Sequence, residues 1–204
     1  MDWLEYLIDA FENVSPDDEE IEDVINNLPA AFESASGESR YAVWTKNWDF
    51  VIKIPRYGYA EEDYCALEVH NYERAKVYGV ERICLPIEKY FETSSGISLY
   101  KQTRYSFSTS DAFSREKRYQ KYLNKRNSPV ALNGSMAYRV QRECYEGWRI
   151  DERWIGRVLQ LYGKKFCRSL EKWTHENKIN DLHNSNTGWL NNKPILLDYA
   201  GYHG

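Results

Sequence analysis

The most constraining feature lies near the end of the sequence, where polar residues stand at fixed distances around a short apolar segment. Asp181 is followed five positions later by Asn186. The next residues are typical of a strand, a turn and a second strand, which ends at another acidic residue, Asp198. A small residue and a glycine, Ala200 and Gly201, follow. This pattern predicts a polar loop and a hairpin that leads the chain to a second carboxylate.

The composition excludes several classes of protein. With 204 residues, 42% of them hydrophobic and 28% charged, the chain has ordinary globular composition and enough length for a core. A net charge of −4 argues against a dedicated nucleic-acid binder. No apolar run reaches the roughly 18 residues of a membrane span. Four cysteines without metal-binding spacing, and no signal peptide, predict reduced thiols in a cytoplasmic protein.

Residues 1–30 are expected to form an acidic helical leader that packs on the strands after it. A second helix is expected to start at Ser15, with Pro16 in its first turn and Glu19 near its positive end. The carboxylates of residues 17–23 indicate a solvated helix face or, alternatively, a surface that docks a basic partner. The first helix has an apolar face at helical spacing, formed by Trp3, Leu4, Leu7, Ile8 and Phe11.

Residues 31–105 have the pattern strand, strand, helix, strand, strand. The helix is expected over 61–78, where Gly79 would end it. The expected strands cover 41–44, 50–54, 82–91 and 97–104. The remaining part, 106–204, is expected to be mainly helical.

The strongest helix signal in that last part is an apolar stripe over 151–177. Residues 106–150 are harder to interpret, with a helix expected around 111–124. Their many aromatic side chains are expected to pack against the long helix.

Lys53 lies inside an apolar strand, where lysine side chains usually face solvent. A helical carboxylate on a facing element would give it a buried partner. Glu68, which follows Lys53 by 15 residues, is the predicted partner, and Glu73 is the alternative.

The loop Asp181-Leu182-His183 to Asn186, followed by Asp198-Tyr199-Ala200-Gly201, resembles the protein kinase-like superfamily. The chain looks most similar to compact kinase-fold proteins of phages and bacteria, and to aminoglycoside-phosphotransferase-like enzymes that share the Asp-Leu-His loop. The resemblance covers roughly residues 32–204, with 106–150 unmatched. It implies an α+β, minimal two-lobed fold: a small lobe with an antiparallel sheet, and a helical lobe truncated after the second motif.

The resemblance also implies ATP and Mg²⁺ as cofactors and gives five residues a role. Asp181 would be the catalytic base, and Lys53 with Glu68 the catalytic ion pair that binds phosphate. Asn186 and Asp198 would be the magnesium ligands.

The nucleotide-binding segments are less clearly marked. Gly37, with Ser39 beside it, is expected to turn backbone N–H groups toward phosphate, and a plain surface turn is the alternative. The adenine edge is expected to meet Gln102 and Thr103 at the end of the last strand. His183 is expected to hydrogen-bond its own loop rather than to bind a metal.

Two functions from different classes remain open at this point. The first is a minimal ATP- and Mg²⁺-dependent kinase that transfers the γ-phosphoryl group to a Ser, Thr or Tyr hydroxyl, on itself or on another protein. The alternative is a catalytically inactive kinase-fold module that binds a host or phage partner protein. Stabilisation by ATP and Mg²⁺ in a thermal unfolding assay would favour the first.

Overall fold

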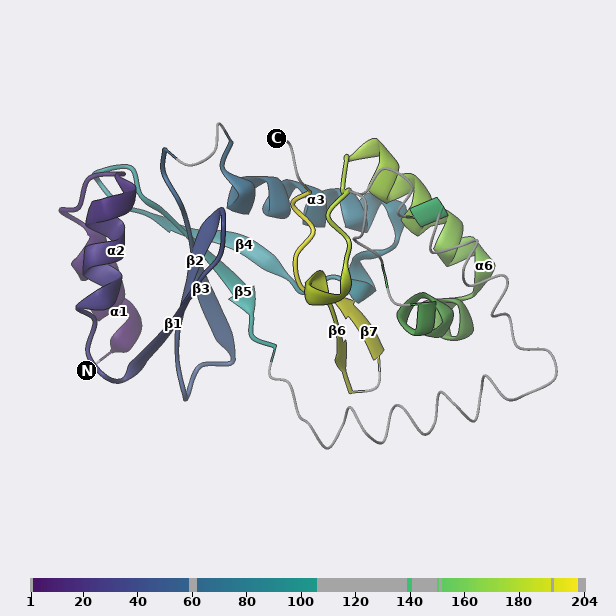
Figure 1. The fold of residues 1–204 in the computed structure, drawn as a ribbon, viewed down its shortest axis with the longest axis horizontal. Coiled ribbons are helices and arrows are strands. Elements are labelled where there is room, and N and C mark those ends of the chain that lie inside the picture. The colour runs from purple at the N-terminus through teal and green to yellow at the C-terminus, as the bar shows by residue number, and fades with distance from the viewer. Residues whose placement is uncertain are drawn as a thin grey trace. The chain divides into compact units, whose positions relative to one another are not determined.

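The chain has a mixed α+β fold, seen here in a computed structural model that describes residues 2–58, 62–105, 139–140, 150, 152–191 and 193–201. These residues include a five-stranded antiparallel sheet, a two-stranded sheet and four α-helices (Figure 1). The chain forms two compact units. Unit 1 contains Met1–Val69 and Pro86–Arg104, and unit 2 contains His70–Leu85 and Tyr105–Gly204.

The five-stranded sheet of unit 1 has the strand order β1-β2-β3-β5-β4. Its strands are β1 (Phe32–Ser36), β2 (Arg40–Thr45), β3 (Phe50–Pro55), β4 (Ile87–Glu92) and β5 (Ser98–Thr103). The expected order of strands and helix is confirmed, with β1 as an additional edge strand. The strand expected over 82–91 begins later, at Ile87, because Glu81–Ile83 forms a turn of 3₁₀ helix instead.

One face of this sheet carries the core of unit 1. Side chains alternate between the two faces of a strand, so Ile52 and Ile54 point away from the face that carries Lys53. The helices α1 (Trp3–Phe11) and α2 (Asp18–Asn26) cover the apolar face (Figure 1). The buried core residues are Leu7, Phe11, Ile21, Ile25, Tyr41, Val43, Ile52, Ile54, Ile97 and Leu99. The prediction that the leader packs on the strands is therefore confirmed.

Both leader helices begin at an aspartate cap. The Asp2 carboxylate accepts a hydrogen bond from the Leu4 N–H at 2.9 Å. The Asp17 carboxylate accepts from the N–H groups of Glu19 and Glu20, at 3.0 and 3.2 Å. The predicted start at Ser15 is wrong, because Asp17 satisfies two N–H groups of the first turn itself.

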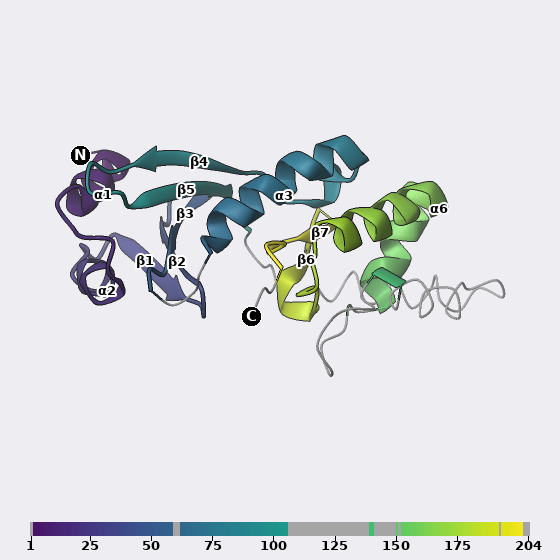
Figure 2. The ribbon, with the colours of Figure 1, turned by 90° about the horizontal axis from the view of Figure 1, so that it is seen from above.

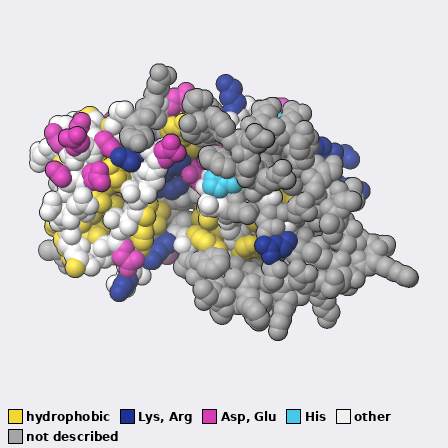
Figure 3. Space-filling model, viewed as in Figure 1, with side chains coloured by type: hydrophobic (Ala, Val, Ile, Leu, Met, Phe, Trp, Pro, Cys, Tyr) yellow, Lys and Arg dark blue, Asp and Glu magenta, His cyan; other side chains and the backbone are white. Residues whose placement is uncertain are grey.

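A second set of polar contacts ties α2 to the sheet. Arg56, directly after β3, forms an ion pair with Asp18 at 2.6 Å, and the Tyr41 hydroxyl donates to the same carboxylate at 3.1 Å. Burial, together with the hydrogen bond to Asp18, raises the pKa of Tyr41 to about 12. The other carboxylates of α2 remain exposed, and Figure 3 shows acidic side chains gathered in the region where Figure 1 places this helix.

Unit 2 is built around α6 (Glu152–Glu176) and a hairpin of β6 (Thr187–Leu190) and β7 (Lys193–Leu196) (Figure 2). The expected single helix over 151–177 is wrong at Gly163, whose φ of 79° and ψ of 175° interrupt it. Its apolar stripe is nevertheless buried on both sides of the interruption. The Trp154 ring N–H donates to the carbonyl groups of Gly188 and Ile195, at 3.1 and 3.2 Å, and so joins α6 to the hairpin.

The helix α3 (Tyr64–Tyr78) ends where the sequence predicted, at Gly79. This residue has a φ of 68°, which glycine adopts without strain. The helix expected over 111–124, and nearly all of the 106–150 segment, lie outside the described residues. None of the helices that the structure describes is long and apolar enough to cross a membrane.

Candidate functional site

The predicted site residues fall into two groups, and the first surrounds a buried carboxylate in unit 1. The Lys53 ammonium of β3 contacts Oε2 of Glu68, on α3, at 2.6 Å. Lys53 is 8% exposed and Glu68 is 0% exposed. The predicted pairing with Glu68 is thus confirmed, whereas the alternative partner Glu73 is exposed and contacts Lys76. The role of the pair in binding phosphate stays a prediction.

Two further side chains bind the same carboxylate, and the sequence analysis did not find them as partners. The Arg40 guanidinium donates to Glu68 Oε2 at 2.8 Å, and the Gln102 amide donates to Oε1 at 2.9 Å. Strand register explains why they converge. Ala42 is opposite Lys53 and Val51 is opposite Gln102, so Arg40 and Gln102 both lie on the face that carries Lys53. Period-two alternation could therefore have indicated Arg40 once the hairpin register was known.

The start of α3 is fixed by a side chain that also binds the sheet. The Asp63 carboxylate accepts from the N–H groups of Cys65 and Ala66, at 2.8 and 3.0 Å, as an N-terminal cap does. The Tyr100 hydroxyl of β5 donates to the same carboxylate at 2.5 Å. Burial, and then this hydrogen bond, raise the pKa of Tyr100. Because the first turn of α3 is held against β5, Glu68 in the next turn is directed at the sheet.

The cluster brings two cations onto one carboxylate, because Arg40 and Lys53 both contact Oε2 of Glu68. Burial raises the pKa of the neighbouring Cys65 thiol to about 12. The charges of Arg40 and Lys53 oppose part of this rise, whereas those of Asp63 and Glu68 add to it. A buried carboxylate with donors on both oxygens is also held rigidly, because moving it would leave charged groups unpaired.

The turn between β1 and β2 was expected to face phosphate through Gly37. Its N–H instead donates to the Arg40 carbonyl at 2.8 Å and so closes the hairpin. The Ser39 hydroxyl accepts from Arg40 Nε at 3.3 Å, and the Ser39 carbonyl accepts from the Arg56 N–H at 3.0 Å. In this conformation the Gly37 N–H is used within the turn and does not face a ligand. This agrees with the alternative prediction of a plain surface turn.

The two residues predicted at the adenine edge differ in their surroundings. Gln102 is buried, pairs in the sheet with both β3 and β4, and its side chain binds Glu68. Thr103 is exposed, and its N–H donates to the Pro86 carbonyl at 3.1 Å. Contact of either residue with a nucleotide stays a prediction.

The second group of predicted residues lies in unit 2, in the loop that follows α6. The Asn186 amide nitrogen donates to the Asp181 carbonyl at 2.7 Å and to its carboxylate at 3.1 Å. His183 Nδ1 accepts from the Ser185 N–H at 3.2 Å, which confirms that this histidine bonds its own loop. Its Nε2 lies 3.2 Å from Asp181 Oδ1. Since Nδ1 is an acceptor, a neutral ring carries its proton on Nε2, facing the Asp181 carboxylate.

The hairpin β6–β7 brings Asp198 back to this loop. The Leu197 N–H donates to the Asn186 carbonyl at 2.9 Å, so Asn186 lies beside the residue that precedes Asp198. The Asp198 carboxylate accepts from the Ala200 N–H at 3.2 Å. The structure therefore brings the two predicted magnesium ligands into one region of unit 2.

The donor atoms of this region fit magnesium. Both contacts of the Asn186 amide nitrogen are to acceptors, which fixes the amide orientation and leaves Oδ1 as a ligand oxygen. With a carboxylate of Asp198, the site offers the hard oxygen ligands that Mg²⁺ prefers. Among the described residues no group of three or more His, Cys, Asp or Glu side chains could hold a metal. Magnesium fits such a sparse set because it is often held by one or two carboxylates, phosphates and water.

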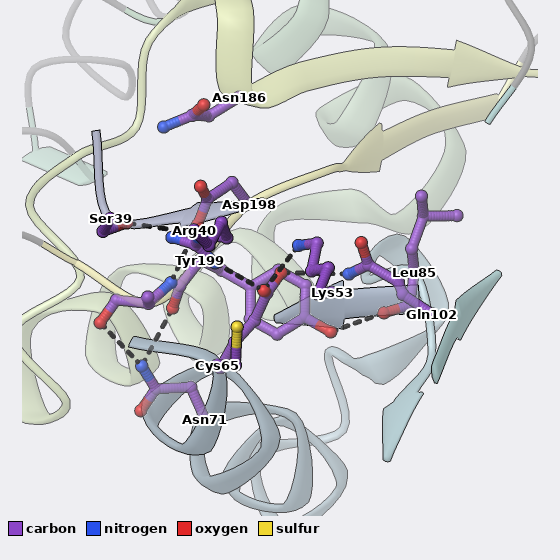
Figure 4. Close-up of polar contacts among 12 residues, drawn as sticks. Ser39, Arg40, Lys53, Cys65, Asn71, Leu85, Gln102, Asn186, Asp198 and Tyr199 are labelled. Atoms are coloured by element: carbon purple, nitrogen blue, oxygen red, sulfur yellow. Dashed lines mark hydrogen bonds and ion pairs between the residues drawn. The ribbon is translucent and has the colours of Figure 1, made fainter. Parts of the chain in front are cut away.

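The segment after Asp198 is held by buried contacts. The Tyr199 hydroxyl donates to the Leu85 carbonyl at 2.5 Å, and the Asn71 amide donates to the carbonyl groups of Tyr199 and Ala200, at 2.8 and 3.2 Å (Figure 4). Gly201 has a φ of 85°, and a Cβ at this position would lie 2.5 Å from the Lys178 carbonyl oxygen. Only glycine fits both the backbone conformation and the space.

Comparison with known proteins identified no relative: no family model matches the chain, and no curated protein or solved structure is significantly similar.

Proposed function

We propose that this chain is a minimal kinase-like phosphotransferase that uses ATP and Mg²⁺ and transfers the γ-phosphoryl group to a hydroxyl, on a protein or on itself. The observation that carries the proposal is the buried Lys53–Glu68 ion pair, formed between a central strand and the helix that follows it. A strand lysine held by a helical glutamate is a requirement of kinase catalysis, because it positions an ammonium group for the nucleotide phosphates.

Unit 2 supports the same proposal independently. A carboxylate and an amide in one loop, followed by a hairpin and a second carboxylate, supply the other parts that phosphoryl transfer needs. Two contacts fix these residues near one another. The Asn186 amide donates to Asp181, and the Leu197 N–H donates to the Asn186 carbonyl.

Each residue would contribute a defined step. Lys53 would bind phosphate oxygens, with Glu68 fixing its position. Asn186 and Asp198 would hold magnesium, which, when bound, offsets charge on the phosphate oxygens. Asp181 would accept the hydroxyl proton as the oxygen forms its bond to the γ-phosphorus and the bond to the ADP oxygen breaks.

The test is transfer of labelled γ-phosphate to the chain itself and to a generic protein substrate. We expect incorporation with the wild type, and losses of at least about 100-fold for Asp198→Asn and Asp181→Asn. Asp49→Asn, a substitution of the same kind at the turn before β3, is the matched control and should keep the wild-type rate. Incorporation that is unchanged in Asp198→Asn would contradict the assignment.

One observation favours the alternative function, an inactive kinase-fold binding module. The Gly37 N–H closes the β1–β2 hairpin and so does not face a nucleotide. Thermal unfolding separates the two functions, since a ligand at about 100 times its Kd stabilises a protein by roughly 2.7 kcal/mol. Stabilisation by ATP and Mg²⁺ without label transfer would favour the binding module, and the absence of both would refute the kinase.

A further inference from the structure

Arg40 occupies a position that the Lys53–Glu68 pair alone does not require. Lys53 and Arg40 both contact the same oxygen of Glu68, Oε2, at 2.6 and 2.8 Å. One carboxylate thus holds two cations, and the Arg40 side chain is largely buried, with 12% of it exposed. The guanidinium of Arg40 and the ammonium of Lys53 are therefore two cationic groups held beside each other at one carboxylate oxygen.

The position of Arg40 in the hairpin determines which face of the sheet its side chain occupies. Arg40 is the first residue of β2 and directly follows the turn at Gly37 and Ser39. Strand alternation places Arg40 on the face of the sheet that carries Lys53, because Ala42 is opposite Lys53. The turn itself contributes little to anion binding, since the Gly37 N–H is bonded to the Arg40 carbonyl.

We propose that Arg40 is a second polyphosphate-binding residue, which acts beside Lys53 and replaces the backbone N–H groups that the β1–β2 turn does not offer. This inference rests on the proposed function, and its ligand is the polyphosphate of a nucleoside triphosphate. A guanidinium group has five N–H donors in a planar fork, a geometry that matches phosphate oxygens. An ammonium group is a more compact donor and matches phosphate less well.

The proposal predicts how affinity depends on the number of phosphates. Arg40 should contribute to binding of ATP and of inorganic tripolyphosphate, which carry several charged oxygens. It should contribute little to binding of adenosine, which carries none. A merely structural Arg40 would instead affect the three ligands equally.

The experiment measures Kd by calorimetry for the complete chain with MgATP, Mg-tripolyphosphate and adenosine. Arg40→Gln should weaken MgATP and tripolyphosphate about 10- to 100-fold, the range for a charged hydrogen bond, and leave adenosine unchanged. Arg157→Gln removes the same charge from α6 in unit 2, where the guanidinium contacts Gln160, and should bind all three ligands as the wild type does. Melting curves without ligand establish that each variant is folded.

Arg40→Lys covers the case in which Arg40→Gln does not fold. It retains the charge but not the fork, and we expect MgATP binding about 3- to 10-fold weaker than in the wild type. Wild-type affinity for MgATP in a folded Arg40→Gln, or in Arg40→Lys when the former is unfolded, would overturn the role of Arg40 and leave the proposed function intact. A wild-type chain that binds neither MgATP nor tripolyphosphate would overturn both proposals.

Discussion

Replacing Glu68 by Gln tests the central contact of unit 1 with almost no change of shape. The substitution removes one negative charge and exchanges one carboxylate oxygen for an N–H donor. In the structure this carboxylate accepts hydrogen bonds from Lys53, Arg40 and Gln102. Glu68→Gln therefore removes the carboxylate charge that two largely buried cations share.

The expected cost follows from the burial of the three charged groups. Breaking a buried ion pair by removal of one partner typically costs about 3–5 kcal/mol, because the remaining charge stays buried without compensation. Here two cations lose the same partner, so we expect the free energy of unfolding to fall by about 3–5 kcal/mol. With a urea dependence of about 2–3 kcal/mol per molar, the midpoint should fall by roughly 1–2.5 M.

The assay is urea unfolding followed by tryptophan fluorescence and by circular dichroism. Glu73→Gln is the matched control, because Glu73 lies on the same helix and contacts Lys76 in an exposed pair. Exposed pairs contribute little to stability, so its midpoint should stay at the wild-type value. If Glu68→Gln unfolds at the same urea concentration as Glu73→Gln, Glu68 is not the buried hub of unit 1 and the reasoning fails.

Three further substitutions or conditions test other parts of the fold. Phe11→Ala empties a fully buried position between the leader and the sheet, and should cost about 3–5 kcal/mol in urea unfolding; Val77→Ala, at a side chain that is 73% exposed, should change little, and equal losses would disprove leader packing. Gly201→Ala should destabilise more than Gly79→Ala, since both have positive φ but only the first meets a backbone oxygen, so equal melting temperatures would contradict the close approach. The free energy of unfolding should fall as pH rises from about 9 toward 12, because the folded chain keeps protons on Cys65, Tyr41 and Tyr100 that the unfolded chain loses. Cys65→Ala should make the slope between about pH 9 and 10 less steep, and an unchanged slope there would exclude a contribution of the thiol.

The local contacts that sequence periodicity can fix were predicted correctly. The apolar run of 50–54 predicts a strand with Lys53 inside it, and the helix that follows can present Glu68 to the face that carries Lys53. The hairpin between Asn186 and Asp198 is likewise a local structure with a clear strand signal. Periodicity succeeds here because each contact joins neighbouring elements of the chain.

The contacts that the sequence did not predict depend on the pairing register of the strands or on competition between two possible helix caps. Arg40 and Gln102 reach Glu68 only because of the pairing of β2 and β5 with β3, which no single segment specifies. Asp17 displaced Ser15 as the helix cap because its carboxylate accepts from two N–H groups. A glycine within a helical pattern, such as Gly163, can mark an interruption of the helix. Here the apolar stripe continues on both sides of Gly163, so the sequence pattern alone does not show that the helix is interrupted.

The shared core of the leader and the sheet has a consequence for synthesis of the chain. Leu7 and Phe11 are made early, yet part of the surface that buries them is Leu99, on the last strand of the sheet. At synthesis rates of about 5–20 residues per second, the apolar face of α1 stays without this partner for on the order of 5–20 s. Ribosome-bound chains that stop before β5 should therefore bind a hydrophobic dye, and chains that extend beyond it by the length of the exit tunnel should not.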